Sequence, residues 1–146
     1  MITVRSYAVA DAAVCAEILT LAGREAFGAS AWPVHDVAAF HSVTQDEAIL
    51  VTERDGVVIG FAAVYAGDAP AHFLHHLYIH PAASGQGAGT LLLAAVVAQF
   101  GPTLSLKVQV SNTRARRFYA RAGWVEDDQV CGVDAVGPWI AMWLGE

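Results

Sequence analysis

Residues 73–93 place a strand, a glycine-rich turn and a helix one after another, and this order restricts the fold more than any other stretch of the chain. Residues 73–79 are rich in apolar, aromatic and β-branched side chains, and Pro81 ends that run. Three glycines then stand at alternate positions: Gly85, Gly87 and Gly89. The almost wholly apolar segment 90–100 predicts a buried helix. A glycine turn that opens a helix leaves backbone N–H groups at the positive end of the helix dipole, so the stretch predicts an anion site whose usual ligand is phosphate.

Two common phosphate-binding motifs fit these glycines poorly. The P-loop ends in Gly-Lys-Ser/Thr, but the only lysine of the chain is Lys107. The dinucleotide motif G-x-G-x-x-G needs an acidic residue about 20 positions later. Gly85 and Gly87 satisfy its first half, but Thr90 stands where the third glycine belongs, and no acid follows until Glu126. A flexible turn without a ligand stays open as the simplest interpretation of the glycines alone.

A second stretch, residues 106–124, makes the glycine loop part of a longer pattern. It reads Leu-Lys-Val-Gln-Val-Ser-Asn-Thr-Arg-Ala-Arg-Arg-Phe-Tyr-Ala-Arg-Ala-Gly-Trp. The residues that match strand-N-x-x-A-x-x-F-Y-x-x-x-G-F/W are Asn112, Ala115, Phe118, Tyr119, Gly123 and Trp124. Gly87 and Gly89 match a loop of the form Arg/Gln-x-x-G-x-G/A, in which Ser84 replaces the usual first residue. In both patterns the chain resembles the GNAT superfamily of N-acetyltransferases, and the resemblance runs in order from about Leu50 to Leu144.

The hydrophobic pattern predicts an α/β (α+β) chain, and the resemblance implies the GNAT fold in a single domain covering residues 1–146. Strands are expected at 3–7, 48–53, 57–65, 73–80, 104–110, 124–131 and 139–144. Helices are expected at 9–27, 34–43, 90–100 and 112–122, with turns at 55–56 and 67–70. The apolar residues at helical spacing in the first helix are Val14, Ile18, Leu21 and Ala22, and those expected to face inward in the second are Val37, Phe40 and His41. This order predicts one mixed, twisted sheet of about seven strands with helices on both faces. In the GNAT fold the central parallel strands, here 73–80 and 104–110, splay apart to admit the cofactor.

The resemblance implies acetyl-CoA as co-substrate and assigns residues to its binding. Backbone N–H groups at a strand bulge, by position Leu77 to Ile79, would hold the thioester oxygen, and the glycine loop would hold the pyrophosphate. Asn112 resembles a cofactor-contacting asparagine of the family, although a helix N-cap would explain the same residue. The cofactor-binding residues expected are Leu77, Tyr78, Ile79, Ser84, Gly85, Gln86, Gly87, Ala88, Gly89, Thr90, Asn112, Arg117 and Tyr119.

The resemblance also implies direct transfer of the acetyl group in a ternary complex, with Tyr119 protonating the departing thiolate. A phenol with a pKa of about 10 is protonated at neutral pH and can donate. The acceptor amine needs a base, for which His75 is the first candidate, and His76 is the runner-up and an acceptor contact. Strand alternation places these two histidines on opposite faces. Trp32 and His35, between the first two helices, are expected to contact the acceptor.

Several histidines lie close together in the sequence and could suggest a metal site, but the geometry of a strand argues against one. The histidines are His72, His75, His76 and His80. Residues four apart lie about 13 Å from each other along a strand, and adjacent residues point to opposite faces. Zinc ligands must all lie about 2 Å from one ion. We therefore expect no metal site.

Charge and composition exclude several classes of protein. The net charge of −6 argues against a nucleic-acid surface. Five of the eight Lys and Arg residues nevertheless lie between Lys107 and Arg121, either as a solvated helix face or as a positive field beside a phosphate-rich cofactor. No apolar run is long enough to span a membrane and no signal peptide is apparent, so we expect a cytoplasmic protein. Cys15 and Cys131 are expected to be small buried hydrophobes.

The function predicted from these observations is N-acetylation of a primary amine by acetyl-CoA, with a small-molecule amine favoured over a peptide or protein amine. The acidic composition is the reason for favouring a small cationic amine. A non-catalytic domain that binds acyl-CoA and has a regulatory role is the alternative, and Ser84 at the usual Arg/Gln position gives it weight. Because C-terminal strands often pair in this family, a homodimer is one expected arrangement.

Overall fold

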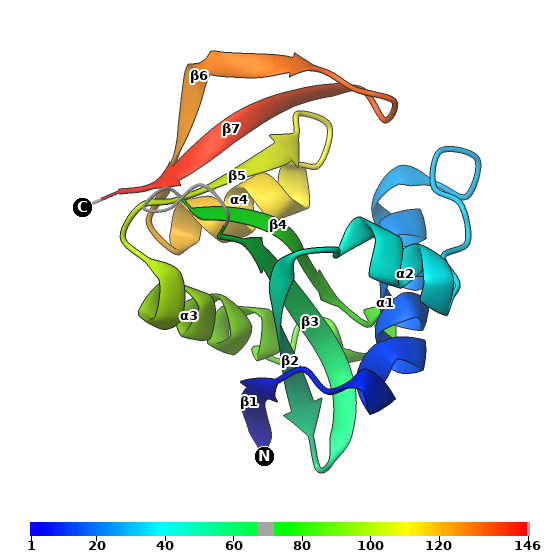
Figure 1. Cartoon of the computed structure of the whole chain (residues 1–146). Helices are drawn as coiled ribbons and strands as arrows, with labels where there is room; N and C mark the ends of the chain where they lie inside the picture. The colour runs from blue at the N-terminus through cyan, green and yellow to red at the C-terminus, as the bar shows by residue number, and fades with distance from the viewer. Residues whose placement is uncertain (67–71, 146) are drawn as a thin grey trace.

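The computed structural model describes residues 1–66 and 72–145 and shows one mixed sheet flanked by helices (Figure 1). Its strands within these residues are β1 (Ile2–Ser6), β2 (Glu47–Arg54), β3 (Val57–Tyr65), β4 (His72–Ile79), β5 (Leu104–Gln109), β6 (Trp124–Val133) and β7 (Pro138–Leu144). They lie in the order β1-β2-β3-β4-β5-β7-β6, and β4 and β5 are parallel to each other. The predicted order of elements and the mixed sheet are confirmed.

Helices cover both faces of this sheet, as predicted. They are α1 (Ala12–Phe27), α2 (Val37–Val43), α3 (Ala88–Phe100) and α4 (Thr113–Arg121), with short 3-10 turns η1 (Val9–Asp11) and η2 (Pro81–Ala83). Neighbouring strand residues point to opposite faces. Accordingly, Leu50 of β2 packs in the core beneath α3, whereas Val51 packs in a second core beneath α1 and α2. Figure 1 shows α1 and α2 together on one side of the sheet and α3 on the other.

The buried stripe of α1 follows helical spacing but differs from the predicted one. Cys15, Ile18 and Leu19, at positions i, i+3 and i+4, are fully buried against the sheet. Leu21, which was expected on the same stripe, is 37% exposed. The helix therefore presents a slightly rotated face to the core, and Leu21 points away from it.

The two central parallel strands separate soon after they begin, and the predicted splay is confirmed. The ladder between β4 and β5 joins residues 72–74 to residues 104–106. Beyond these pairs β4 continues against β3, while β5 continues against β7. In the described part of the chain, the second half of β4 therefore has no ladder partner on its β5 side. This gap positions the candidate site.

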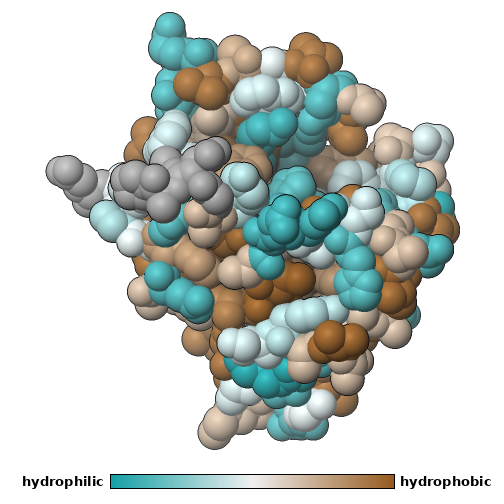
Figure 2. All heavy atoms as spheres, viewed as in Figure 1, coloured by the Kyte–Doolittle hydropathy of each residue, from teal (hydrophilic) through white to brown (hydrophobic). Residues whose placement is uncertain are grey.

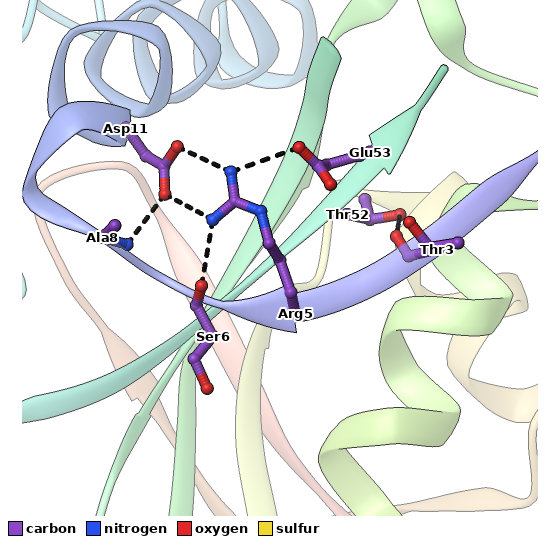
Figure 3. Close-up of polar contacts among 7 residues, drawn as sticks. All are labelled: Thr3, Arg5, Ser6, Ala8, Asp11, Thr52 and Glu53. Atoms are coloured by element: carbon purple, nitrogen blue, oxygen red, sulfur yellow. Dashed lines mark hydrogen bonds and ion pairs between the residues drawn. The ribbon is translucent and has the colours of Figure 1, made fainter. Parts of the chain in front are cut away.

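One arginine ties the start of the chain to β2 (Figure 3). Arg5 donates to both carboxylate oxygens of Asp11, at 2.8 and 2.9 Å, and to Glu53 at 3.2 Å. Asp11 also accepts a hydrogen bond from the N–H of Ala8 at 2.8 Å, and its side chain is buried. The Arg5 guanidinium holds the pKa of Asp11 below its usual range. The network fixes the point at which α1 starts relative to the sheet.

The second helix is shorter than the sequence pattern suggests. It begins at Val37 because the Asp36 carboxylate accepts a hydrogen bond from the N–H of Ala39 at 2.8 Å and caps it. Phe40 is fully buried, as predicted. Val37 and His41, which were expected to face inward, are exposed. A helix of two turns has room for only one deeply buried side chain here.

The two cysteines have different surroundings. Cys15 is buried, as predicted, but Cys131 is exposed because it lies on β6, a strand at the edge of the sheet. The prediction that both are buried is therefore wrong for Cys131. The turn expected at 67–70 lies outside the described residues. In the described part of the chain, no helix has the length and apolar character that crossing a membrane requires.

Candidate active site

A cavity of about 810 Å³ opens where β4 and β5 separate. The end of β4, the glycine loop, the first turn of α3 and α4 supply most of its lining. The residues predicted to bind the cofactor that line it are Leu77, Tyr78, Ile79, Ser84, Gly85, Gly87, Ala88, Gly89, Thr90, Asn112 and Tyr119. Two further predicted residues, Gln86 and Arg117, lie outside the lining formed by the described residues. The two sequence patterns therefore meet at one cavity.

The glycine loop presents bare backbone to this cavity. Gly85 and Gly87 have φ values of 78° and 86°, which favour glycine. Gly87 is the N-cap of α3. The N–H groups of Ala88, Gly89 and Thr90 lie in the first turn and therefore have no helical carbonyl as a hydrogen-bond partner. A Cβ added at Gly85 or Gly87 would meet no atom within 4 Å. A ligand can therefore approach this backbone closely, as a phosphate at a helix N-terminus must.

The cationic residues near the cavity do not act as one group. Arg114 and Arg121 of α4 line the cavity, and Arg114 forms an ion pair of 3.2 Å with Glu25, which also lines it. Arg116 instead forms an ion pair with Glu126, with nitrogen–oxygen distances of 2.8 and 2.9 Å. The two interpretations of the basic cluster therefore apply to different residues. Arg121 places positive charge at the cavity, Glu25 offsets the charge of Arg114 there, and Arg116 is paired with Glu126 on the solvated surface.

Tyr119 stands in the cavity wall on α4, packed edge-on against Phe118 and Trp124. Burial raises the pKa of Tyr119 above its usual range, and the neighbouring Tyr78 phenol adds to the effect. Burial also raises the pKa of Tyr78 to about 12. Both phenols therefore carry their protons at neutral pH, and Tyr119 is a potential proton donor inside the cavity.

The helix that carries Tyr119 has well-defined ends. The side-chain oxygen of Asn112 accepts a hydrogen bond from the N–H of Ala115 at 3.2 Å and caps the start of α4. Gly123, with φ of 96°, follows its end and donates to the carbonyl of Ala120 at 3.1 Å. The N-cap interpretation of Asn112 is confirmed. Its contact with the cofactor stays a prediction, although Asn112 also lines the cavity.

A bulge in β4 lies at His75, two residues before the predicted position at Leu77 to Ile79. The register pairs that flank it are Val64 with Leu74 and Ala63 with His76. His75 is the extra residue, and an extra residue shifts the alternation of side chains. The rings of His75 and His76 lie 3.8 Å apart instead of on opposite faces. The opposite-face prediction, on which part of the argument against a metal rested, is wrong here.

Glu47, at the start of β2, joins these two histidines and was missed from the sequence. Its Oε2 lies 2.6 Å from Nδ1 of His75, and its side chain is only 5% exposed. His76 is buried, and its Nε2 lies 3.4 Å from the carbonyl of Val43. Burial lowers the pKa of His76 to about 3, and the adjacent His75 contributes, so His76 is neutral. Glu47 and His75 are 28 residues apart, and no local motif signals their contact.

The residues predicted to contact the acceptor gather around Tyr78. The ring centroids of Trp32 and His76 lie 6.2 and 6.0 Å from that of Tyr78, and His35 lies 5.5 Å from Trp32. Trp32 is held against α1 by a hydrogen bond of 3.0 Å from Nε1 to the carbonyl of Leu19. Figure 2 shows a hollow in the surface between the β6–β7 hairpin and the α1–α2 side. Acceptor binding by these residues stays a prediction.

The sheet thus splays at a parallel pair, with a glycine loop after the end of β4 and the phenol of Tyr119 lining the same cavity. The chain belongs to the acetyltransferase (GNAT) family, whose sequence model matches residues 15–124. That range includes both the glycine loop and the helix that carries Tyr119.

Sequence relatives agree with this assignment over part of their length. The chain is 36% identical over 81 residues to an uncharacterized N-acetyltransferase of Mycobacterium tuberculosis (strain H37Rv) and equally to one of Mycobacterium bovis. The aligned region is 53% of this chain and 52% of each relative. The chain thus spans about half the length of the curated relatives it matches.

Solved structures share the whole fold at low sequence identity. The ribosomal-protein-S18-alanine N-acetyltransferase of Escherichia coli has a TM-score of 0.77 and 19% identity, covering 100% of this chain and 96% of that one. PaiA N-acetyltransferase of Thermoplasma acidophilum, in complex with coenzyme A, has a TM-score of 0.76 and 17% identity, with coverage of 97% and 98%. YncA of Salmonella typhimurium, with acetyl-CoA, has a TM-score of 0.72 and 23% identity, with coverage of 99% and 95%.

Proposed function

We propose that the protein transfers the acetyl group of acetyl-CoA to a primary amine. The observation that carries this proposal is a single cavity that joins the bare backbone of residues 84–90 to the protonated phenol of Tyr119. The first end suits a pyrophosphate, and the second suits a departing thiolate. Family membership and the coenzyme A complexes of two proteins with the same fold support acetyl-CoA as the donor.

The chemistry is a direct transfer in a ternary complex. The amine gives up one proton to solvent, and its nitrogen attacks the thioester carbonyl. The carbon–sulfur bond then breaks, the nitrogen loses its second proton to solvent, and Tyr119 gives its proton to the coenzyme A thiolate and regains one from solvent. Backbone N–H groups on the open side of β4 stabilise the oxyanion that develops on the carbonyl. These groups are available because β5 leaves β4 after residues 72–74. No covalent enzyme intermediate is needed, and the buried Cys15 takes no part.

A small-molecule amine is the favoured acceptor, since the net charge of −6 attracts small cations. A peptide N-terminus is the second candidate. Two proteins of the same fold are described as N-acetyltransferases of ribosomal-protein alanine, from Escherichia coli and Brucella melitensis. A third candidate is a domain that binds acyl-CoA without catalysis.

A thiol-release assay separates these candidates. Purified protein is incubated with acetyl-CoA and a panel containing a diamine, an amino sugar and a short peptide that begins with alanine. Coenzyme A release above the amine-free rate with the diamine or amino sugar supports the favoured acceptor class, and release with the peptide alone selects the second. If calorimetry shows that coenzyme A binds but no amine of a broad panel causes thiol release, the third candidate, a domain that binds acyl-CoA without catalysis, is selected. Absence of both binding and release would overturn the proposal.

A further inference from the structure

Two buried acceptor atoms beside the β4 bulge have no hydrogen-bond partner in the described part of the chain: Oε1 of Glu47 and Nδ1 of His76. Buried polar atoms are nearly always paired, and an orphan calls for a specific explanation such as an ion. Both side chains are deeply buried, with 5% of Glu47 and 8% of His76 exposed. The hydrogen bond between Glu47 and His75 involves the other carboxylate oxygen, so it satisfies neither orphan.

These orphans belong to a cluster of lone-pair donors. Glu47, His75 and His76 each offer one ligand atom, and the three atoms lie within 4.8 Å of one another. Two imidazoles and one carboxylate are a donor set that zinc favours, with a fourth position left for water or another ligand. Ligand atoms around a tetrahedral zinc lie about 3.4 Å apart, so side-chain movements of about 1 Å would complete the geometry.

We propose that Glu47, His75 and His76 bind a divalent transition-metal ion of the zinc type at the bulge of β4. The bulge brings two adjacent histidines to one side, and the register of β2 against β3 and β4 brings the carboxylate to them. His75 is 41% exposed and gives the ion a route from solvent. Nε2 of His76 lies 3.4 Å from the carbonyl of Val43, which leaves the lone pair of Nδ1 available to the metal.

This site goes beyond acetyl transfer and does not depend on it. It gives the two histidines a task other than the general base expected from the sequence. The ion would tie the start of β2 to β4 at the point where β4 parts from β5. That point is two residues from Leu77, which lines the cavity, so the metal would set the position of the strand that the thioester approaches.

The test uses tag-free protein carrying Cys131→Ser, because an exposed thiol can bind zinc and would compete with the cluster. After the protein is stripped with a chelator, Zn²⁺ is titrated by calorimetry without acetyl-CoA, and Co²⁺ is followed by its visible absorption. We expect one ion per chain with micromolar or tighter affinity. Glu47→Gln and His75→Gln should each weaken it at least about ten-fold. Mg²⁺, which prefers oxygen ligands, should not compete.

His41→Gln is the matched control, because His41 is exposed and lies outside the cluster. It should leave Zn²⁺ affinity unchanged. Circular dichroism and thermal melts establish that each variant is folded, and Glu47→Asp, which keeps a carboxylate, should retain more affinity than Glu47→Gln. Failure of the parent protein to bind Zn²⁺ or Co²⁺ would overturn the proposal. Binding that Glu47→Gln and His75→Gln leave intact would overturn it as well, because the ion would then sit elsewhere.

Discussion

The cofactor cavity and the Glu47–His75–His76 cluster lie next to each other along β4 but arise from the sequence in different ways. Most of the cavity comes from two continuous stretches, 77–90 and 111–122. Within each stretch a turn and a helix fix the sequence spacing of the residues that line the cavity, so these residues form a motif that can be recognised in the sequence. The cluster comes from residues 28 positions apart, which meet only because three strands pair in one register with one bulge.

The difference shows which kind of site a sequence discloses. Helix caps and glycine turns depend on the few residues around them, so they can be predicted without knowing how the strands are paired. A side chain on a strand depends on register, and a shift of one residue moves it to the opposite face. His75 is such a residue, because the bulge that carries it decides what its ring meets.

Gly87→Glu should show the largest difference between the cavity and the Glu47–His75–His76 cluster. It places a carboxylate at the N-cap of α3, where phosphate would approach, and should weaken coenzyme A binding about 100-fold or more in calorimetry. Zn²⁺ affinity should not change. Gly87→Asn tolerates the φ of 86° without adding charge, and Gln86→Glu adds the same charge outside the cavity lining. Both controls should keep most of the affinity. Equal losses in Gly87→Glu and Gln86→Glu would contradict a specific phosphate contact at Gly87.

Tyr119→Phe tests the chemistry of the cavity wall while keeping its shape. Loss of the proton donor should lower kcat by about ten- to a thousand-fold, with little change in coenzyme A affinity. Tyr65→Phe, which removes a hydroxyl from a partly exposed tyrosine on β3, is the matched control and should have wild-type kcat. An unchanged kcat for Tyr119→Phe would show that the phenol is structural and that water protonates the thiolate.

Much of the fold could be predicted from the sequence because its signals are local. Asp55 and Gly56 close the β2–β3 hairpin with the positive φ values that such a turn requires, 52° and 83°. Gly123 ends α4 in the same local way. The failures share a different cause. Cys131 is exposed because β6 is at an edge of the sheet, and Glu47 is buried because of strand register, and neither fact is encoded near the residue itself.

Asp11→Asn acts far from both regions and should leave the intrinsic affinities of both unchanged. It removes the buried one of the two carboxylates that Arg5 contacts, and we expect the free energy of unfolding to fall by about 2 kcal/mol at pH 7. The folded-state pKa of Asp11 is lowered, chiefly by its hydrogen bonds with Arg5. The wild-type advantage should therefore be complete above the unfolded pKa of about 4 and shrink as the pH falls below it.

Urea unfolding between pH 3 and pH 7 measures this advantage. Asp55→Asn is the control, because its ion pair with the N-terminal amine is exposed, with 77% of the Asp55 side chain accessible to solvent. Asp55→Asn should have the same midpoint of urea unfolding as the wild type at every pH. A difference between wild type and Asp11→Asn that did not shrink toward pH 3 would mean that the Arg5–Asp11 charge pair is not its source.

Ser84→Arg should have the smallest effect and bears on the one departure of the glycine loop from the family pattern. Ser84 is exposed at the cavity rim, and its hydroxyl donates to the carbonyl of Pro81 at 3.1 Å. An arginine there keeps the backbone that binds phosphate and adds a charged donor, so coenzyme A affinity should rise by about two- to ten-fold. Ser84→Glu should lower it by a similar factor, and both effects should shrink in high salt because the position is exposed. If Ser84→Arg abolished binding, Ser84 would not occupy the first position of the loop. The residues that bind the phosphate could then not be assigned from the local sequence, just as the histidine cluster could not.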